Sequence, residues 1–251
     1  MAALRRLARR ATADKIAREV RELPFNPRLH TMSHAPLRIA HRGMPRRFPE
    51  NTLPSFAEAL DCGAQGIELD VHATADDVVV VHHDPRTARG LEIAAVRWEE
   101  LHRGTRSSVA IPTLESVCEL VGDRAELFVE IKGLGIERAV LRVLAAHRGR
   151  FALHSFDHRT IGRIALLEPS MRLGLLFEDR VSDVAALLAA HGASDAWPHH
   201  SIVDARMVEQ VHDADCRVIV WTVNEPGQVQ RLTALGVDGI CTDDVTLLAG
   251  S

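Results

Sequence analysis

Two pairs of charged residues have the spacing that places side chains on one face of a strand. Glu68 and Asp70 alternate with apolar residues in one run, and Glu130 and Lys132 repeat this spacing in another. Successive side chains of a strand point to opposite faces, so each pair shares a face. Converging carboxylates repel one another unless a cation lies between them, and such oxygen ligands suit Mg²⁺ or Ca²⁺. The pattern predicts a metal-assisted site.

A simpler interpretation exists for the first pair. Glu68 and Asp70 alone fit the solvent face of a half-buried strand equally well, because most charged side chains are exposed. The apolar residues on both sides favour a strand that is buried on both faces, where a charge needs a partner or a metal. Zinc is disfavoured because no cysteine or histidine pair has the spacing of zinc ligands.

A histidine and two cations add acid–base and anion-binding groups. His41 follows a short apolar run and precedes Arg42 and Gly43, and an imidazole beside a guanidinium suits an acid or base with a phosphate clamp. Gly43 would let the backbone turn close to a ligand. With 14 histidines in the chain, His41 alone carries little weight. Lys132 is one of only two lysines, beside 28 arginines, and it stands where a strand should end.

The spacing between Glu68 and a second histidine predicts a hairpin. Only residues 74–77 separate two apolar runs, too few for the helix of a parallel crossover. With the turn centred between positions 75 and 76, Glu68 lies opposite His83. Alternation then places His82 on the other face. We therefore assign chemistry to His83 and a structural role to His82, and leave the role of Asp84 open.

In sequence order these motifs resemble the glycerophosphodiester phosphodiesterase family, one of the barrel phosphodiesterases that include phosphatidylinositol-specific phospholipases C. The matching segments run from about residue 37 to residue 244: His41-Arg42-Gly43, Glu50-Asn51-Thr52, Glu68-x-Asp70, His83-Asp84, Ile111-Pro112-Thr113-Leu114-Glu115, Glu130-Ile131-Lys132, Ser155-Phe156, Trp221-Thr222-Val223-Asn224 and Asp238-Gly239-Ile240-Cys241-Thr242-Asp243. The roles that the resemblance implies are a catalytic pair, His41 and His83; a metal site, Glu68, Asp70 and Glu130; and phosphate contacts, Arg42 and Lys132.

The chain departs from the family pattern between the second histidine and Ile111. Segments 85–90 and 101–107 are a reduced version of a region that shapes the alcohol side of the pocket in relatives. This departure affects the identity of the substrate more than the type of reaction.

Length and patterning predict an α/β fold, a single (β/α)₈ TIM barrel, which typically needs about 250 residues. The chain has 251 residues, of which 46% are hydrophobic. Apolar runs predict eight strands, at 37–41, 66–72, 127–132, 151–156, 172–177, 195–199, 217–223 and 238–242. Helical patterns lie at 54–62, 136–146, 158–167, 181–190, 204–214 and 225–234. Patterning alone does not separate a barrel from an open sheet; the resemblance favours the barrel.

The first 36 residues differ in composition from the rest. They are rich in arginine and predict two short helices that break near Thr12, with the second ending before Pro24. We divide the chain into this basic helical extension, 1–36, and the barrel, 37–251. The extension either covers the bottom of the barrel or is partly disordered, or it contacts an anionic membrane surface through residues 1–35.

Composition also excludes several classes of protein. No apolar run is long enough to span a membrane or to act as a secretion signal, which predicts a cytoplasmic protein, peripheral to the membrane if the extension binds lipid. The net charge of −4 and the lack of a basic stripe with interleaved aromatics exclude nucleic acid as a partner. The four dispersed cysteines are interpreted as buried small hydrophobes. The sequence leaves the oligomeric state open.

The function expected from this resemblance is hydrolysis of a glycerophosphodiester to sn-glycerol 3-phosphate and an alcohol, with one divalent cation, Mg²⁺ or Ca²⁺, and with Mn²⁺ also admissible. One of His41 and His83 acts as base and the other as acid, with water or the neighbouring glycerol hydroxyl as nucleophile. Two alternatives remain. One is cleavage of lysophospholipids at a membrane surface, and the other is phosphodiester binding without turnover.

Overall fold

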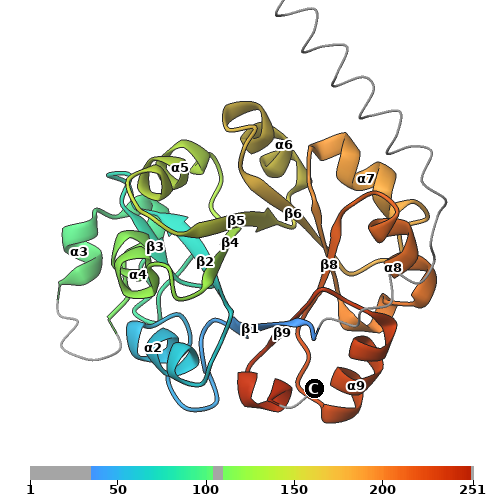
Figure 1. Cartoon of the computed structure of the whole chain (residues 1–251). Coiled ribbons are helices and arrows are strands. Elements are labelled where there is room, and N and C mark those ends of the chain that lie inside the picture. The colour runs from blue at the N-terminus through green and yellow to red at the C-terminus, as the bar shows by residue number, and fades with distance from the viewer. Residues whose placement is uncertain (1–34, 104–109, 250–251) are drawn as a thin grey trace, which may run out of the picture. The chain divides into compact units, whose positions relative to one another are not determined.

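Eight parallel strands form a closed barrel in the computed structural model, which describes residues 35–103 and 110–249 (Figure 1). The strands of the barrel are β1 (Leu37–His41), β2 (Gly66–Ala73), β4 (Glu126–Ile131), β5 (Arg150–Ser155), β6 (Arg172–Phe177), β7 (Asp195–Pro198), β8 (Arg217–Val220) and β9 (Gly239–Thr242). Neighbouring strands pair in parallel, and β1 pairs with both β2 and β9, which closes the barrel. The predicted (β/α)₈ barrel is confirmed.

Helices alternate with these strands and cover the outside of the barrel. They are α2 (Leu53–Asp61), α4 (Leu114–Val121), α5 (Glu137–Ala145), α6 (His158–Leu167), α7 (Val184–His191), α8 (Ala205–His212) and α9 (Pro226–Leu235). Among the described residues, the short 3₁₀ helix η3 (Val245–Leu248) is the only helix after β9. All six predicted helices are present within a few residues of their expected bounds.

Helix α4 was not predicted, although its sequence carries the signals of a helix. Thr113 caps its first turn by accepting a hydrogen bond from the Ser116 amide at 3.1 Å. The buried residues of α4 recur at the spacing of one helical face: Leu114, Val117, Cys118 and Val121. The helical periodicity begins inside the family-like Ile111–Glu115 motif, at Leu114, and the sequence analysis used this motif only for the resemblance.

The predicted hairpin is confirmed, but its register differs by one residue. Strand β3 (Val79–Val81) is antiparallel to β2, with Val71 opposite Val81, whereas the prediction placed Asp70 there. The turn contains three residues, because the Thr74 amide donates to the Val78 carbonyl at 3.0 Å and Asp77 has a left-handed φ of 61°. The turn is thus centred on a residue and not between two. Segment 82–113 then contains η1 (Ile93–Ala95) and α3 (Trp98–His102).

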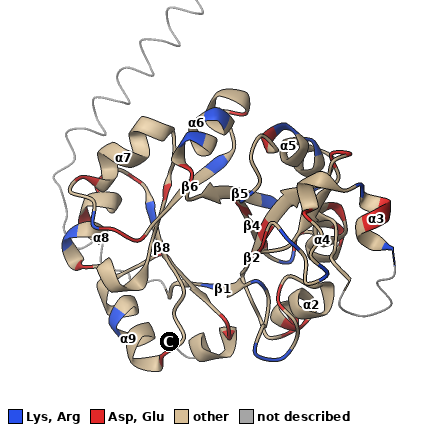
Figure 2. Cartoon of the chain, turned by 180° about the vertical axis from the view of Figure 1, so that it is seen from behind, with Lys and Arg blue, Asp and Glu red and all other residues tan. Residues whose placement is uncertain are grey.

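Two apolar layers hold the barrel together. Outward-facing strand residues pack against the helices in the larger cluster. The inside of the barrel is filled by Ile39, Phe128, Ala152, Leu176, Trp197, Ile219 and Cys241. Charged residues lie on the strands above and below this inner layer, and Figure 2 shows acidic segments on β2 and β4. Because βα loops of a parallel barrel emerge at the carboxyl ends of the strands, the upper charged layer opens toward these loops.

Some predictions concern residues outside the described ranges. The two short helices expected before Pro24 fall in residues 1–34, and part of segment 101–107 is likewise outside the description. Within the described ranges, no helix has the length and apolar character required to cross a membrane. The four cysteines are free; Cys118 and Cys241 are buried as expected, whereas Cys62 and Cys216 are partly exposed.

Candidate active site

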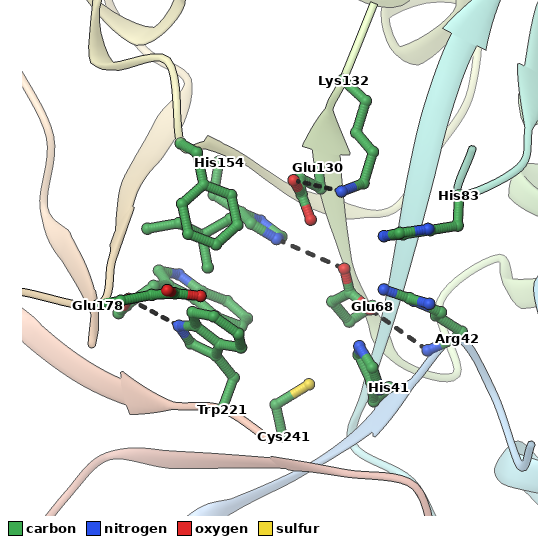
Figure 3. A pocket seen from close by; sticks show the side chains of 13 residues that line it. His41, Arg42, Glu68, His83, Glu130, Lys132, His154, Glu178, Trp221 and Cys241 are labelled. Atoms are coloured by element: carbon green, nitrogen blue, oxygen red, sulfur yellow. Dashed lines mark hydrogen bonds and ion pairs between the residues drawn. The ribbon is translucent and has the colours of Figure 1, made fainter. Parts of the chain in front are cut away.

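One pocket opens at the carboxyl ends of the barrel strands (Figure 3). Its cavity volume is about 210 Å³. Its lining is His41, Arg42, Glu68, His83, Glu130, Lys132, His154, Phe156, Leu176, Glu178, Trp197, Trp221 and Cys241. Six of the seven predicted site residues line it. The seventh, Asp70, is fully buried and contacts two of the lining cations.

Asp70 holds the two phosphate-contact candidates in place. Its carboxylate lies 3.0 Å from Arg42 Nε and 3.5 Å from Lys132 Nζ, and it accepts a 2.8 Å hydrogen bond from Asn51 Nδ2. Burial alone would raise the pKa of Asp70, but Arg42, Lys132 and Asn51 together lower it, so the carboxylate is ionised. Asp70 Oδ1 is nevertheless buried and accepts no hydrogen bond from the described residues. The cations thus balance the charge but leave one acceptor unsatisfied.

Glu130 is the least stable carboxylate of the site in its ionised form. Burial and the charge of Asp70 raise its pKa to about 8, although Lys132, 3.1 Å away, acts in the opposite direction. Glu68 adds further repulsion. At neutral pH the site therefore carries more carboxylates than its own cations stabilise. Such a set fits a divalent cation, which would relieve the repulsion and bind the unsatisfied oxygen of Asp70.

A histidine that was not predicted lies beside these carboxylates. His154, on β5, is paired with Glu130 in the sheet, and its Nε2 lies 3.6 Å from Glu68 Oε1. Ligand atoms of Glu68, Glu130 and His154 all lie within 4.8 Å of one another. The sequence signal was its position two residues before the family-like Phe156, at the end of an apolar strand.

His41 is oriented by a carboxylate from the last strand of the barrel. Its Nδ1 lies 2.7 Å from Asp243 Oδ1, and Asn224 Nδ2 donates to the other oxygen of Asp243 at 2.7 Å. A carboxylate only accepts, so Nδ1 carries the proton and Nε2 is left for the substrate. Burial lowers the pKa of His41, but Asp243 and Glu68 outweigh it and raise the value. Asp243 and Asn224 belong to family-like motifs, but no role was predicted for either from the sequence.

The turn after β1 is built for packing. Arg42 and Gly43 have φ values of 54° and 89°, and a Cβ on Gly43 would lie 2.7 Å from the Ser55 backbone carbon. The close approach that Gly43 makes in this structure is to helix α2, whereas the sequence analysis expected an approach to a ligand. The backbone amide of Arg42 donates to Glu68 Oε2 at 3.2 Å. The side chain of Arg42 donates from Nη1 to Glu50 Oε1 at 3.0 Å.

His83 reaches the pocket, but not through strand alternation. Strand β3 ends at Val81, and the chain bends before His83, whose Nδ1 lies 2.8 Å from Asp84 Oδ1. His82 is not among the lining residues, and its ring contacts the Asp84 carbonyl. The hydrogen bond to His83 lowers the pKa of Asp84. Asp84, whose role was left open, thus orients the histidine that precedes it.

The opposite wall of the pocket is aromatic (Figure 3). Phe156 meets Trp221 edge to face, with ring centroids 5.4 Å apart, and Trp221 Nε1 donates to the Trp197 carbonyl at 2.9 Å. Glu178, after β6, adds an exposed carboxylate to this wall. The site therefore has a charged half that suits a phosphate and an aromatic half that suits an organic group.

The fold and the position of the pocket define a TIM barrel with its site at the usual catalytic face. The model of the glycerophosphoryl diester phosphodiesterase family matches residues 41–247. The chain belongs to this family and is a phosphoric diester hydrolase.

Individual relatives and solved structures support this family membership. A glycerophosphodiester phosphodiesterase of Caldanaerobacter subterraneus is 33% identical over 82% of this chain and 93% of its own. One from Bacillus altitudinis is 34% identical with the same coverage. Among solved structures, an Oleispira antarctica phosphodiesterase in complex with the product sn-glycerol 3-phosphate has a TM-score of 0.78 and 25% identity, covering 85% of this chain and 96% of its own. A Silicibacter pomeroyi protein has a TM-score of 0.77 and 27% identity, covering 84% and 90%.

Proposed function

We propose that this protein hydrolyses glycerophosphodiesters to sn-glycerol 3-phosphate and an alcohol. The observation that carries the proposal is the convergence of two histidines and two cations, His41, His83, Arg42 and Lys132, on one pocket. Glu68 and Glu130 also line this pocket, and Asp70 is buried against Arg42 and Lys132. This set provides an acid, a base, an anion clamp and a cation site together. The relatives from Caldanaerobacter subterraneus and Bacillus altitudinis are named for the same activity.

Glu68, Asp70 and Glu130 are the proposed holders of one divalent cation, Mg²⁺ or Ca²⁺, with Mn²⁺ also suited. When bound, this cation supplies charge stabilisation to the phosphoryl oxygens. The unsatisfied Asp70 oxygen and the raised pKa of Glu130 support the assignment, because both are explained by a positive charge that the side chains themselves do not provide.

The two histidines move the protons. The raised pKa of His41 favours its imidazolium form, so His41 is assigned as the acid that protonates the leaving alkoxide at Nε2. His83, oriented by Asp84, is assigned as the base that accepts the proton of the nucleophile. Arg42 and Lys132 bind the phosphate and stabilise the negative charge that develops in the transition state.

A second candidate substrate is a lysophospholipid. Three large apolar side chains on the loops after β1, β4 and β5 are exposed: Phe48, Leu134 and Phe156. These loops surround the mouth of the pocket, where an acyl chain or a membrane would be met. This candidate also gives a role to residues 1–35, as a basic membrane contact. We also propose that the protein is cytoplasmic. The proposed division of the chain is a basic extension, 1–36, and a barrel, 37–251.

The test is release of product from matched substrates. Purified protein is given glycerophosphocholine, glycerophosphoethanolamine or lysophosphatidylcholine, with Mg²⁺, Ca²⁺ or Mn²⁺ and with EDTA. Glycerol 3-phosphate from the water-soluble diesters, abolished by EDTA, is expected. Turnover of lysophosphatidylcholine alone, with vesicle binding lost on removal of residues 1–35, would select the second candidate. No turnover of any of them would leave only phosphodiester binding.

A further inference from the structure

His154 is a buried polar side chain without a structural role in hydrogen bonding. Its ring is 1% exposed, and its Nδ1 is buried with no hydrogen-bond partner among the described residues. Its Nε2 lies 3.6 Å from Glu68 Oε1, beyond the length of a good hydrogen bond. Since buried polar groups are normally satisfied, an explanation is needed for this ring.

The ring plane is fixed by stacking and not by hydrogen bonds. His154 lies flat against the indole of Trp197, with centroids 4.3 Å apart and an interplanar angle of 9°. Gly174 leaves the space for this arrangement, because a Cβ there would lie 2.7 Å from the Trp197 indole and 3.2 Å from the His154 Cβ. Packing therefore holds the imidazole edge-on to the carboxylates, as a ligand must be held (Figure 3).

The position of His154 is also the position of a ligand. It is the neighbour of Glu130 across the β4–β5 pairing. A ring nitrogen of His154 and carboxylate oxygens of Glu68 and Glu130 all lie within 4.8 Å of one another. Asp70 lies deeper, and its Oδ2 is engaged by Arg42 and Asn51, so only its Oδ1 is left for a cation. His154 would therefore add a nitrogen donor to the carboxylate oxygens of the site.

We infer that His154 is a direct nitrogen ligand of the metal and gives the site a preference for first-row ions such as Mn²⁺ over Mg²⁺ and Ca²⁺. Imidazole binds first-row transition ions well, whereas Mg²⁺ and Ca²⁺ are served by oxygen ligands. The inference rests on the proposed metal site, but it concerns which ion the site selects and not which diester is hydrolysed.

Equilibrium binding of the metal alone tests it, without substrate. Wild type is expected to bind Mn²⁺ at least about tenfold more tightly than Mg²⁺, measured by calorimetry or by the loss of the free Mn²⁺ electron paramagnetic resonance signal. His154→Gln should weaken Mn²⁺ binding about 10- to 100-fold and change Mg²⁺ binding less than about threefold, which removes the preference. His147→Gln, a change two residues after the end of helix α5, is the matched control and should leave both affinities unaltered.

A spectroscopic readout separates a ligand from a positioning group. Electron spin echo modulation from a coordinated imidazole nitrogen is expected in Mn²⁺-loaded wild type and in His41→Gln, and it should be absent in His154→Gln. Equal affinities for Mn²⁺ and Mg²⁺ in wild type, or no nitrogen modulation there, overturn the inference even if the variant fails to fold. A parallel fall of both affinities in His154→Gln would mean that His154 only positions Glu68. Because these readouts need no turnover, failure of the proposed hydrolysis is detected separately, by the product assay.

Discussion

The barrel contains two layers of charged side chains, and they differ in how completely they are paired. At the amino ends of the strands, Arg217 donates to Asp195 at 2.9 and 2.7 Å and to Glu126 at 3.2 Å, while Arg172 lies 3.0 Å from Asp195. Burial lowers the pKa of Arg217, but the two carboxylates outweigh burial and raise the pKa above its ordinary value, so the charge of Arg217 is stabilised. This layer is complete without any ligand.

The layer at the carboxyl ends is incomplete by the same criteria. Asp70 Oδ1 and His154 Nδ1 are buried without hydrogen-bond partners among the residues that the structure describes. Glu130 has a pKa raised to about 8 by burial and by its neighbours. Buried charge that is fully paired stabilises a defined structure, whereas buried charge that lacks partners indicates a place where a ligand supplies them. Pairing, more than the presence of charge, separates the functional end of this barrel from the structural end.

The largest effect should come from removing an acid–base group of the upper layer. His41→Ala or His83→Ala is expected to lower kcat by about 10²- to 10⁴-fold, the usual scale for general acid–base catalysis, with the thermal midpoint nearly unchanged. Product release from glycerophosphocholine measures this. His82→Ala is the matched control, because its ring lies outside the pocket, and it should retain activity. Equal losses in the His82 and His83 variants would contradict the assignment.

Removing a carboxylate from the charged layer at the amino ends of the strands should lower the stability of the fold and leave the catalytic activity unchanged. Asp195→Ala leaves Arg217 and Arg172 without their shared carboxylate and is expected to cost about 3 to 5 kcal/mol of unfolding free energy. Chemical denaturation measures the loss. Under native conditions the folded fraction should keep the KM of wild type. A changed KM with unaltered stability would show that the two layers are not separate in function.

Neutralising one upper carboxylate should stabilise the metal-free protein. The folded pKa of Glu130, about 8, lies above its ordinary value of 4.5, so ionisation costs stability as pH rises from about 4.5 to about 8. Glu130→Gln in EDTA at pH 8 is expected to raise the thermal midpoint by several degrees, since about 1 kcal/mol corresponds to roughly 2 to 4 °C in a chain of this size. The rise should be absent at pH 4, and added metal should no longer shift the midpoint. A lower midpoint at pH 8 would exclude the proposed repulsion.

The smallest effect concerns the pH profile. Asp243 raises the pKa of His41, so Asp243→Asn should lower it. Because the proposed acid role needs the imidazolium form, activity at alkaline pH should end at a lower pH in the variant, measured as kcat against pH. The protonated ring stabilises the fold below its unfolded pKa, and this contribution disappears as pH rises through the raised folded pKa. A shift of the acidic limb of the kcat profile would instead make His41 the base.

Much of the molecule follows from local patterns in the sequence. Apolar runs and alternation located the eight strands, because strand spacing is a property of the backbone. The same alternation placed Glu68 with Asp70, and strand ends placed His41 and Lys132, because parallel strands of a barrel end at one face. Six of the seven predicted site residues meet at the pocket or directly beneath it for this reason, whereas His83 reaches it from the segment after the antiparallel strand β3.

Contacts between distant segments needed the tertiary structure. Asp243 reaches His41 across 202 positions of the chain only because β9 closes the barrel on β1. His154 lies beside Glu130 because β5 pairs with β4, and its place at the end of an apolar strand does not by itself distinguish it among 14 histidines. The hairpin register depended on the left-handed residue Asp77, a backbone choice that alternation does not encode. The sequence by itself determined which side chains face the inside of the barrel. Barrel closure and strand pairing decided which of these side chains touch, because the neighbours of each strand are set only when the whole barrel is formed.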